Sequence, residues 1–262
     1  MLLWTLGIAA GSYFLVFSLA YLFQEKLIFF PDKLPQHYRF SFSTAWKEWQ
    51  LKTTDGIILH GLLFSAAAKP KGLIFYLHGN AGSCDSWGTI AGLYANLNYD
   101  LFILDYRGFG KSEGTIYSEE QFYTDVQSAY DELKPSYEEK NIVIIGFSIG
   151  TGAAAMLASK NHPKLLILQA PYYSLTDLTR RLYPFLPAIA LKYKFRTYQF
   201  IPQILAPVVL FHGDRDEVVY YGSSLKLKPL LKPADKLITL KGQLHNGLNE
   251  NPEYINALRA LL

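Results

Sequence analysis

Ser148 lies between two glycines in the stretch GFSIG, residues 146–150. The preceding residues 141–145 consist of one asparagine and four apolar, β-branched residues, which is typical of a strand buried in a parallel sheet. Residues 151–160 are rich in alanine and predict a helix. A serine at so sharp a strand-to-helix corner has a strained backbone and an exposed hydroxyl, and the glycines at 146 and 150 avoid Cβ clashes. The stretch therefore predicts a nucleophile elbow for acyl transfer.

The chain after Ser148 contains a possible general base and two possible carboxylates. A serine hydroxyl is a poor nucleophile at neutral pH and needs a base within hydrogen-bond reach. Asp214 and Asp216 follow one apolar run, and His245 follows the last one. Serine, then aspartate, then histidine is the chain order expected with such an elbow. His245 is the only histidine after Asp216, whereas the spacing leaves both aspartates open as its partner.

The loop HGNAGS, residues 78–83, follows another apolar run and is rich in glycine. Its backbone N–H groups could bind an oxyanion, because the loop opens toward a predicted helix. Cys84 directly after it is a weaker candidate nucleophile, since no elbow surrounds it. We interpret Cys84 as a small residue in the first turn of that helix.

Apolar runs of strand length alternate with helical stretches along residues 46–262. Residues 47–52 and 57–65 predict an antiparallel hairpin. Further strands are predicted at residues 72–77, 101–105, 142–146, 165–169, 208–212 and 237–240. This alternation predicts a mostly parallel sheet with helices on both faces, whose functional site lies at the carboxyl ends of the strands. Gly110, Lys111 and Ser112 imitate the end of a phosphate-binding loop, but no helix follows directly, so nucleotide binding is not expected.

The composition excludes several classes of protein. The chain has 262 residues, an apolar fraction of 50% and a net charge of +3 without a long basic run, so nucleic acid is not an expected partner. A single cysteine excludes an internal disulfide. We find no cluster of histidine, cysteine and acidic residues with metal-ligand spacing, and we expect neither a metal nor another cofactor.

Residues 1–23 form a separate apolar segment without charged side chains. A helix of this length can cross a hydrocarbon layer of about 30 Å, and Trp4 and Tyr21 lie near its ends, where interfacial aromatic residues are common. The segment lacks the basic start of a signal peptide and exceeds its usual apolar length. We therefore expect a retained, single-pass transmembrane anchor, followed by an irregular connection over residues 24–45.

The flanking charges predict the side of the membrane on which the domain lies. Lys26, Lys33 and Arg39 all follow the apolar segment, and no basic residue precedes it. Because cytoplasmic flanks of membrane helices carry an excess of lysine and arginine, this bias favours a cytoplasmic domain.

Five stretches, HGNAG, DYRGFGKSEG, GFSIG, HGDRDEVV and LHN, occur in this order. With them the chain resembles the α/β-hydrolase superfamily over nearly everything after the anchor, and in particular its membrane-anchored, bud-emergence-type serine hydrolases. The resemblance implies an eight-stranded, mostly parallel sheet with a short helical cap at about residues 172–206. It also implies that Ser148 is the nucleophile, Asp216 the acid and His245 the general base. The backbone N–H groups of Asn80 and Ile149 match the oxyanion hole.

The activity implied is hydrolysis of carboxylic esters, thioesters or lipid acyl groups through an acyl-enzyme, with a membrane-embedded or small-molecule acyl substrate. A serine peptidase or an acyltransferase would use the same three side chains, and a catalytically silent binding scaffold is the alternative from another class. Two departures from the family pattern leave the pose of the acid and base open. Tyr220 stands where proline is common, and Gln243 and Leu244 stand where an extra glycine is common.

The cap region is basic and aromatic. It contains Arg180, Arg181, Lys192, Lys194 and Arg196, interleaved with Tyr183, Phe185, Tyr193, Phe195, Tyr198 and Phe200. One interpretation is an ordinary lid whose aromatic rings pack on the domain and whose charges are solvated. The other is a surface that faces the bilayer, where cations and aromatic rings are both stabilised.

Overall fold

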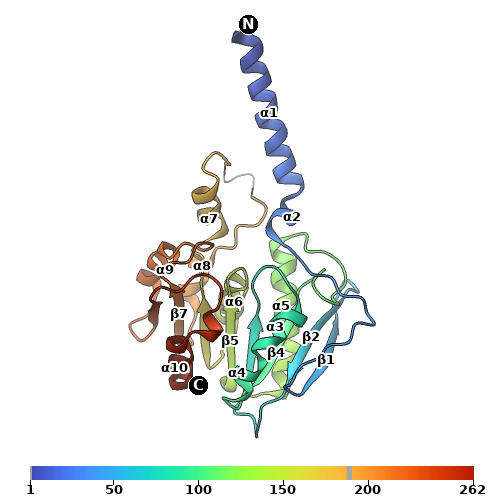
Figure 1. The fold of residues 1–262 in the computed structure, drawn as a ribbon, viewed down its shortest axis with the longest axis vertical. Helices are drawn as coiled ribbons and strands as arrows, with labels where there is room; N and C mark the ends of the chain where they lie inside the picture. The colour runs from blue at the N-terminus through green and yellow to red at the C-terminus, as the bar shows by residue number, and fades with distance from the viewer. Residues whose placement is uncertain (1, 188–190) are drawn as a thin grey trace.

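The computed structural model describes residues 2–187 and 191–262 and consists of a long N-terminal helix and an α/β domain (Figure 1). The eight strands form one sheet in the order β1-β2-β4-β3-β5-β6-β7-β8. Their bounds are β1 Trp46–Lys52, β2 Ile58–Phe64, β3 Leu73–Leu77, β4 Asp100–Asp105, β5 Ile142–Phe147, β6 Leu165–Gln169, β7 Val208–Gly213 and β8 Lys236–Leu240. β2 pairs antiparallel with β1 and β4, and the strands from β4 to β8 are parallel.

Helices cover both faces of the sheet. The helices of the domain are α3 Cys84–Trp87, α4 Ala91–Ala95, α5 Glu119–Leu133, α6 Gly150–Lys160, α7 Leu175–Leu182, α8 Thr197–Phe200, α9 Gly222–Leu227 and α10 Pro252–Leu261. Because successive strand side chains point to opposite faces, β3 divides its residues between two cores. Phe75 packs in one core with α5 and α6, and Tyr76 packs in the other with α4 and α10. The predicted mostly parallel sheet with helices on both faces is confirmed.

The N-terminal helix α1, Leu2–Leu22, projects away from the domain (Figure 1). Its segment from Trp4 to Leu22 has a mean hydropathy of 1.6, and none of that segment is buried against the domain. Length and composition therefore suit a membrane-spanning helix. A soluble helix of this kind would leave a long apolar surface in water, which is costly.

The prediction of an irregular connection over residues 24–45 is wrong at its start, where Gln24–Ile28 form the short helix α2. α2 docks on the cap through the side chains of Gln24 and Glu25. The side-chain Oε1 of Gln24 accepts the backbone N–H of Lys192 at 2.8 Å, and Lys192 Nζ lies 3.1 Å from a Glu25 carboxylate oxygen. These partners are far away in sequence, so local propensity does not reveal the helix.

The loop after β4 holds the β1–β2 hairpin and α5 together. The Arg107 guanidinium binds Asp125 through Nε at 2.6 Å and Asp55 through Nη1 at 2.7 Å. Lys111 Nζ binds a Glu48 carboxylate oxygen at 2.9 Å and lies over the Phe40 ring. The cations of this loop are therefore engaged within the domain.

Candidate active site

The corner between β5 and α6 places Ser148 at the end of the sheet. Ser148 has a positive φ of 50°, a conformation that is strained for a residue with a Cβ. A Cβ on Gly146 would lie 2.8 Å from the Gly150 carbonyl oxygen, and a Cβ on Gly150 would lie 2.2 Å from the Leu77 carbonyl oxygen. The two glycines therefore allow the close approach that the elbow requires, as the sequence predicts.

Ser148, His245 and Asp216 form one chain of hydrogen bonds. Ser148 Oγ lies 3.1 Å from His245 Nε2, and His245 Nδ1 lies 2.7 Å from Asp216 Oδ2. A carboxylate can only accept, so the ring carries its proton on Nδ1 and leaves Nε2 free to accept from the serine hydroxyl. The His245 ring packs on the Phe147 ring, with 5.0 Å between centroids.

Four donors surround the carboxylate of Asp216. Oδ1 accepts the backbone N–H groups of Val218 at 2.9 Å and Val219 at 2.7 Å, and Oδ2 faces both His245 and His212. Burial by itself raises the pKa of this carboxyl, but the hydrogen bonds from His212, His245 and Val218 outweigh burial and hold the pKa well below its usual value. The side chain is thus a buried anion over the ordinary pH range.

His212 is a supporting residue that sequence reasoning missed. Its Nε2 lies 2.7 Å from the Val219 carbonyl oxygen and 3.3 Å from Asp216 Oδ2, and its Nδ1 lies 2.7 Å from Ser224 Oγ. Because a carbonyl accepts only, Nε2 carries the proton and Nδ1 accepts from the serine. The signal in the sequence is the histidine that ends the apolar run before Asp216.

Asp214 lies apart from His245. Its carboxylate accepts the backbone N–H of Gly242 at 2.6 Å, and the residue is exposed. It therefore closes the turn between β7 and the loop after β8. Of the two aspartates that the sequence leaves open, the structure brings Asp216 to the histidine.

The two residues expected at the oxyanion hole, Asn80 and Ile149, both line the cavity that contains Ser148. No described residue accepts a hydrogen bond from either backbone N–H. The Asn80 side chain accepts the N–H of Phe30 at 3.0 Å and donates to the Ile28 carbonyl oxygen. This pair of bonds ties the loop after β3 to the segment that follows α2.

The cavity above Ser148 has a volume of about 420 Å³ and is mainly apolar. Leu175, Leu178 and Leu182 of α7 line one wall. Ala20 near the end of α1 and Leu27 of α2 line the opposite wall. The N-terminal segment is therefore part of the cavity, which the sequence does not indicate.

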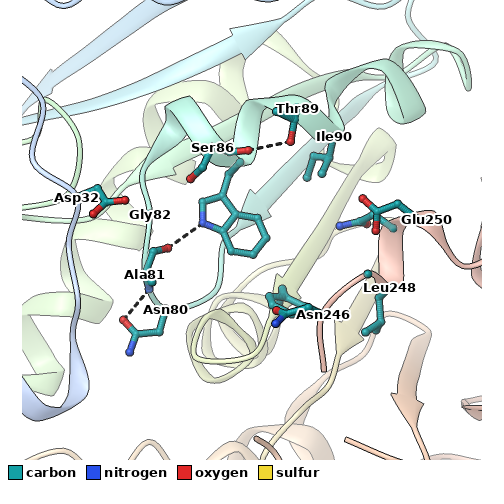
Figure 2. Close-up of a pocket in the computed structure, with 14 residues that line it drawn as sticks. Asp32, Asn80, Ala81, Gly82, Ser86, Thr89, Ile90, Asn246, Leu248 and Glu250 are labelled. Carbon is teal, nitrogen blue, oxygen red and sulfur yellow. Dashed lines mark hydrogen bonds between the residues drawn. The ribbon is translucent and has the colours of Figure 1, made fainter. Parts of the chain in front are cut away.

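A second cavity of about 400 Å³ adjoins the first at Asn80 (Figure 2). It reaches Phe147 and Asn246, the neighbours in sequence of Ser148 and His245, and its walls are more polar. Figure 2 shows Asn80 and Ala81 on one side and Glu250 on the other. The cavity is therefore lined by a chain neighbour of both Ser148 and His245.

The folding of the chain brings His60, Cys84 and Asp105 together, although their spacing in the sequence predicts no metal site. Their possible ligand atoms lie within 4.8 Å of one another, and all three residues are buried. Burial raises the pKa of the Cys84 thiol well above its usual value, so the group is a neutral thiol. Asp105 accepts the Cys84 N–H at 2.7 Å, and Glu48 lies 3.0 Å from the far nitrogen of His60. We interpret the cluster as a hydrogen-bonded support of the core.

Residues 68–198, half of the chain, match the profile of the family described as serine aminopeptidase, S33, and the chain belongs to this hydrolase family. It is an α/β-hydrolase enzyme of the bud-emergence type, as the five sequence motifs indicate. The chain is 29% identical to protein bem46 of Schizosaccharomyces pombe over 77% of its own length and 73% of that protein.

Two further similarities agree with this assignment. The chain is 27% identical to α/β-hydrolase domain-containing protein 17C of Xenopus tropicalis, over 83% of this chain and 70% of that protein. A solved esterase of Pyrococcus furiosus superposes with a TM-score of 0.70 at 20% identity, covering 89% of this chain and 98% of the esterase. This structural likeness establishes the α/β-hydrolase fold.

Proposed function

We propose that the protein is a membrane-anchored serine hydrolase that cleaves ester, thioester or lipid acyl bonds. The observation that supports this proposal best is the hydrogen-bond chain from Ser148 through His245 to Asp216 at the floor of an apolar cavity. His245 removes the serine proton during attack and returns it to the leaving group, and Asp216 holds the ring tautomer and stabilises its charged form. Water then releases the acyl group from Ser148.

In this proposal the negative charge that forms on the substrate carbonyl is bound by the N–H groups of Asn80 and Ile149. Both amides lack an acceptor among the described residues and line the cavity beside the serine. A preorganised donor of this kind contributes on the order of 3 kcal/mol to the transition state. The bonds between Asn80 and the segment after α2 keep one donor in place.

The two cavities suggest how a substrate lies. The apolar cavity suits an acyl chain, and its wall of Ala20 and Leu27 places it next to the proposed anchor. The leaving group must face His245, because that residue supplies its proton, and the lining of the more polar cavity includes Asn246, the next residue in the chain. We therefore expect acyl substrates that enter from the membrane and leaving groups that are polar.

A peptidase would use the same chemistry, and the description of the family gives it some support. Peptide substrates are polar along their backbone, however, and the cavity at Ser148 is mainly apolar. We therefore place acyl lipids and other long-chain acyl compounds before peptides as candidate substrates.

Labelling with a fluorophosphonate, which reacts with activated serines, tests the proposal in membranes that contain the full chain. We expect covalent labelling of the wild type and none of Ser148→Ala, together with hydrolysis of a long-chain p-nitrophenyl ester by the wild type alone. Absence of labelling and of turnover, in membranes where another serine hydrolase reacts, would instead support a silent scaffold.

A further inference from the structure

Helix α7 lines two different cavities with its opposite faces. Leu175, Leu178 and Leu182, spaced by three and four residues, line the apolar cavity above Ser148. The opposite face, which includes Thr176 and Arg180, lines another cavity of about 560 Å³. One short helix therefore separates the apolar cavity from a second, chemically different one.

The cavity behind α7 is basic. Arg180, Lys194 and Arg196 line it, and none of the three side chains forms an ion pair or hydrogen bond with a described residue. The one acid in its lining, Asp177, binds Lys226 Nζ at 2.6 Å and 2.8 Å. Three uncompensated cations thus face a single hollow.

The other two cations of the cap are already engaged. Lys192 binds Glu25, and the Arg181 guanidinium lies 3.8 Å from the centroid of the Tyr220 ring. Tyr193 and Phe195 are fully buried, so these rings pack on the domain and do not face a bilayer. These residues of the cap therefore behave as an ordinary lid. Only Arg180, Lys194 and Arg196 remain candidates for a surface that faces the bilayer.

Two tyrosines complete the basic cavity. The rings of Tyr173 and Tyr198 stack with 4.6 Å between centroids and 10° between planes, and both residues line the hollow. Arginine forks and tyrosine hydroxyls are donors that suit the several oxygens of a phosphate group. A site of this composition favours a phosphate over a carboxylate, because a phosphate offers more acceptor oxygens.

α7, which forms one wall of the basic cavity, lies on the side of the domain from which α1 projects (Figure 1). After α7 the chain passes through Tyr183 and Phe185, which are exposed, and the Phe185 carbonyl oxygen accepts the Tyr13 hydroxyl of α1 at 3.1 Å. Tyr13 lies about halfway along α1. If α1 spans a membrane, this contact therefore places Phe185 within the lipid layer, and Arg180, five residues earlier in α7, would lie closer to the membrane surface. Lipid headgroups are then the phosphates at the highest local concentration.

We propose that Arg180, Lys194 and Arg196 form a binding site for a terminal phosphate, a monoester with three free oxygens, on an anionic lipid headgroup, directly behind the wall of the acyl cavity. The inference rests on the proposed membrane anchoring. A headgroup in this site would hold α7 at the surface and keep the mouth of the acyl cavity next to the lipid chains.

The reactivity of the Lys194 amine with an acylating reagent, measured by peptide mass spectrometry, tests the site. The full chain is compared in nanodiscs of phosphatidylcholine alone, with phosphatidic acid, and with phosphatidylserine at equal surface charge. We expect phosphatidic acid to slow the acylation of Lys194 severalfold and phosphatidylserine to slow it less. Replacing Arg180 and Arg196 by glutamine should weaken this protection by on the order of fivefold for each arginine.

The control variant, Lys47→Gln with Lys69→Gln, removes the same charge from exposed positions elsewhere and should keep full protection. If phosphatidic acid and phosphatidylserine slow the acylation of Lys194 equally, the negative membrane surface attracts the cations without a specific site. That result would overturn the proposal. Equal protection by inorganic phosphate in phosphatidylcholine nanodiscs would show a site for a free anion and overturn the lipid assignment. A chain that does not enter nanodiscs would overturn both this inference and the anchoring, whereas a chain that enters without protection would overturn this inference alone.

Discussion

At the scale of single residues, the polarity of the hydrogen bonds decides the proposed roles. Asp216 accepts from His245 and His212 and from two backbone N–H groups, so it stays ionised and directs the proton of His245 to Nδ1. Ser148 then faces a ring nitrogen that can accept. His212 cannot touch a substrate bound at Ser148, since it is fully buried beneath Asp216. We regard it as a positioning residue.

The first prediction separates the two aspartates. Asp216→Asn should lower kcat by several orders of magnitude while the protein stays folded, because an amide can stabilise the wrong tautomer of His245. Asp214→Asn should have a small effect, since its carboxylate accepts only the Gly242 N–H. Steady-state hydrolysis of one ester by both variants, with circular dichroism as the folding control, gives the comparison. Reversed effects would contradict the assignment of the acid.

The second prediction concerns acid pH. The folded-state pKa of Asp216 lies below its ordinary value of 3.8, so its contribution to stability is complete above that pH and is lost as pH falls through the folded pKa. For one such carboxylate the loss is on the order of 2 kcal/mol.

Asp216→Asn has no charge to lose at this position. Its thermal midpoint should therefore fall less steeply than that of the wild type below the ordinary carboxyl pKa of 3.8. Thermal unfolding of both proteins across a series of acidic buffers measures the difference. If the thermal midpoints of the two proteins fall in parallel with pH, ionised Asp216 does not stabilise the fold.

At the scale of elements, α7 forms one wall of the cavity above Ser148, and the end of α1 together with α2 forms another. The cavity of about 420 Å³ is bounded by Leu178 on one side and Leu27 on the other. Hydrogen bonds and an ion pair hold α2 against the cap; they join Gln24 and Glu25 to Lys192 and Tyr193. If an acyl chain lies in this cavity, as proposed, the distance between these walls limits its length.

The third prediction follows from that wall. Leu178→Trp should fill part of the cavity and shorten the longest acyl chain that is cleaved efficiently, because an indole takes more volume than an isobutyl group. Activity on acetyl esters should change little. Profiles of kcat/KM over a series of p-nitrophenyl esters measure the effect. Leu182→Trp, at the exposed end of α7, should have a smaller effect on the same profile. If neither variant changes the profile, the acyl chain does not lie in this cavity.

At the scale of the whole molecule, the apolar helix and the end of the sheet that carries Ser148 lie on the same side. Figure 1 shows α1 leaving the domain beside α2 and on the side of α7. With α1 in a bilayer, the mouth of the acyl cavity would lie close to the lipid surface. This arrangement favours substrates that are already in the membrane over soluble ones.

The fourth prediction is the side of the membrane. Lys26, Lys33 and Arg39 follow α1, and the positive-inside tendency places them in the cytoplasm together with the domain. In sealed cells or right-side-out vesicles, added protease should therefore leave residues 46–262 intact, and detergent should expose them. A domain digested without detergent lies on the extracytoplasmic side, contrary to this prediction.

The sequence by itself determined the fold class, the strands and the elbow at Ser148, because these depend on local periodicity and on glycines that the corner requires. It also limited the base to His245 by chain order. It could not choose between Asp214 and Asp216 without the family resemblance, since both end one strand and only packing decides which carboxylate meets the histidine. His212 was missed for the same reason.

Other features were decided only by the tertiary structure. α2 forms because Gln24 and Glu25 meet Lys192 and Tyr193, residues distant in sequence. The five cations of the cap look alike in the sequence, yet two are engaged within the protein and three face one cavity. Long-range contacts carry no local pattern, so the composition of a segment can predict its charge but not where that charge points.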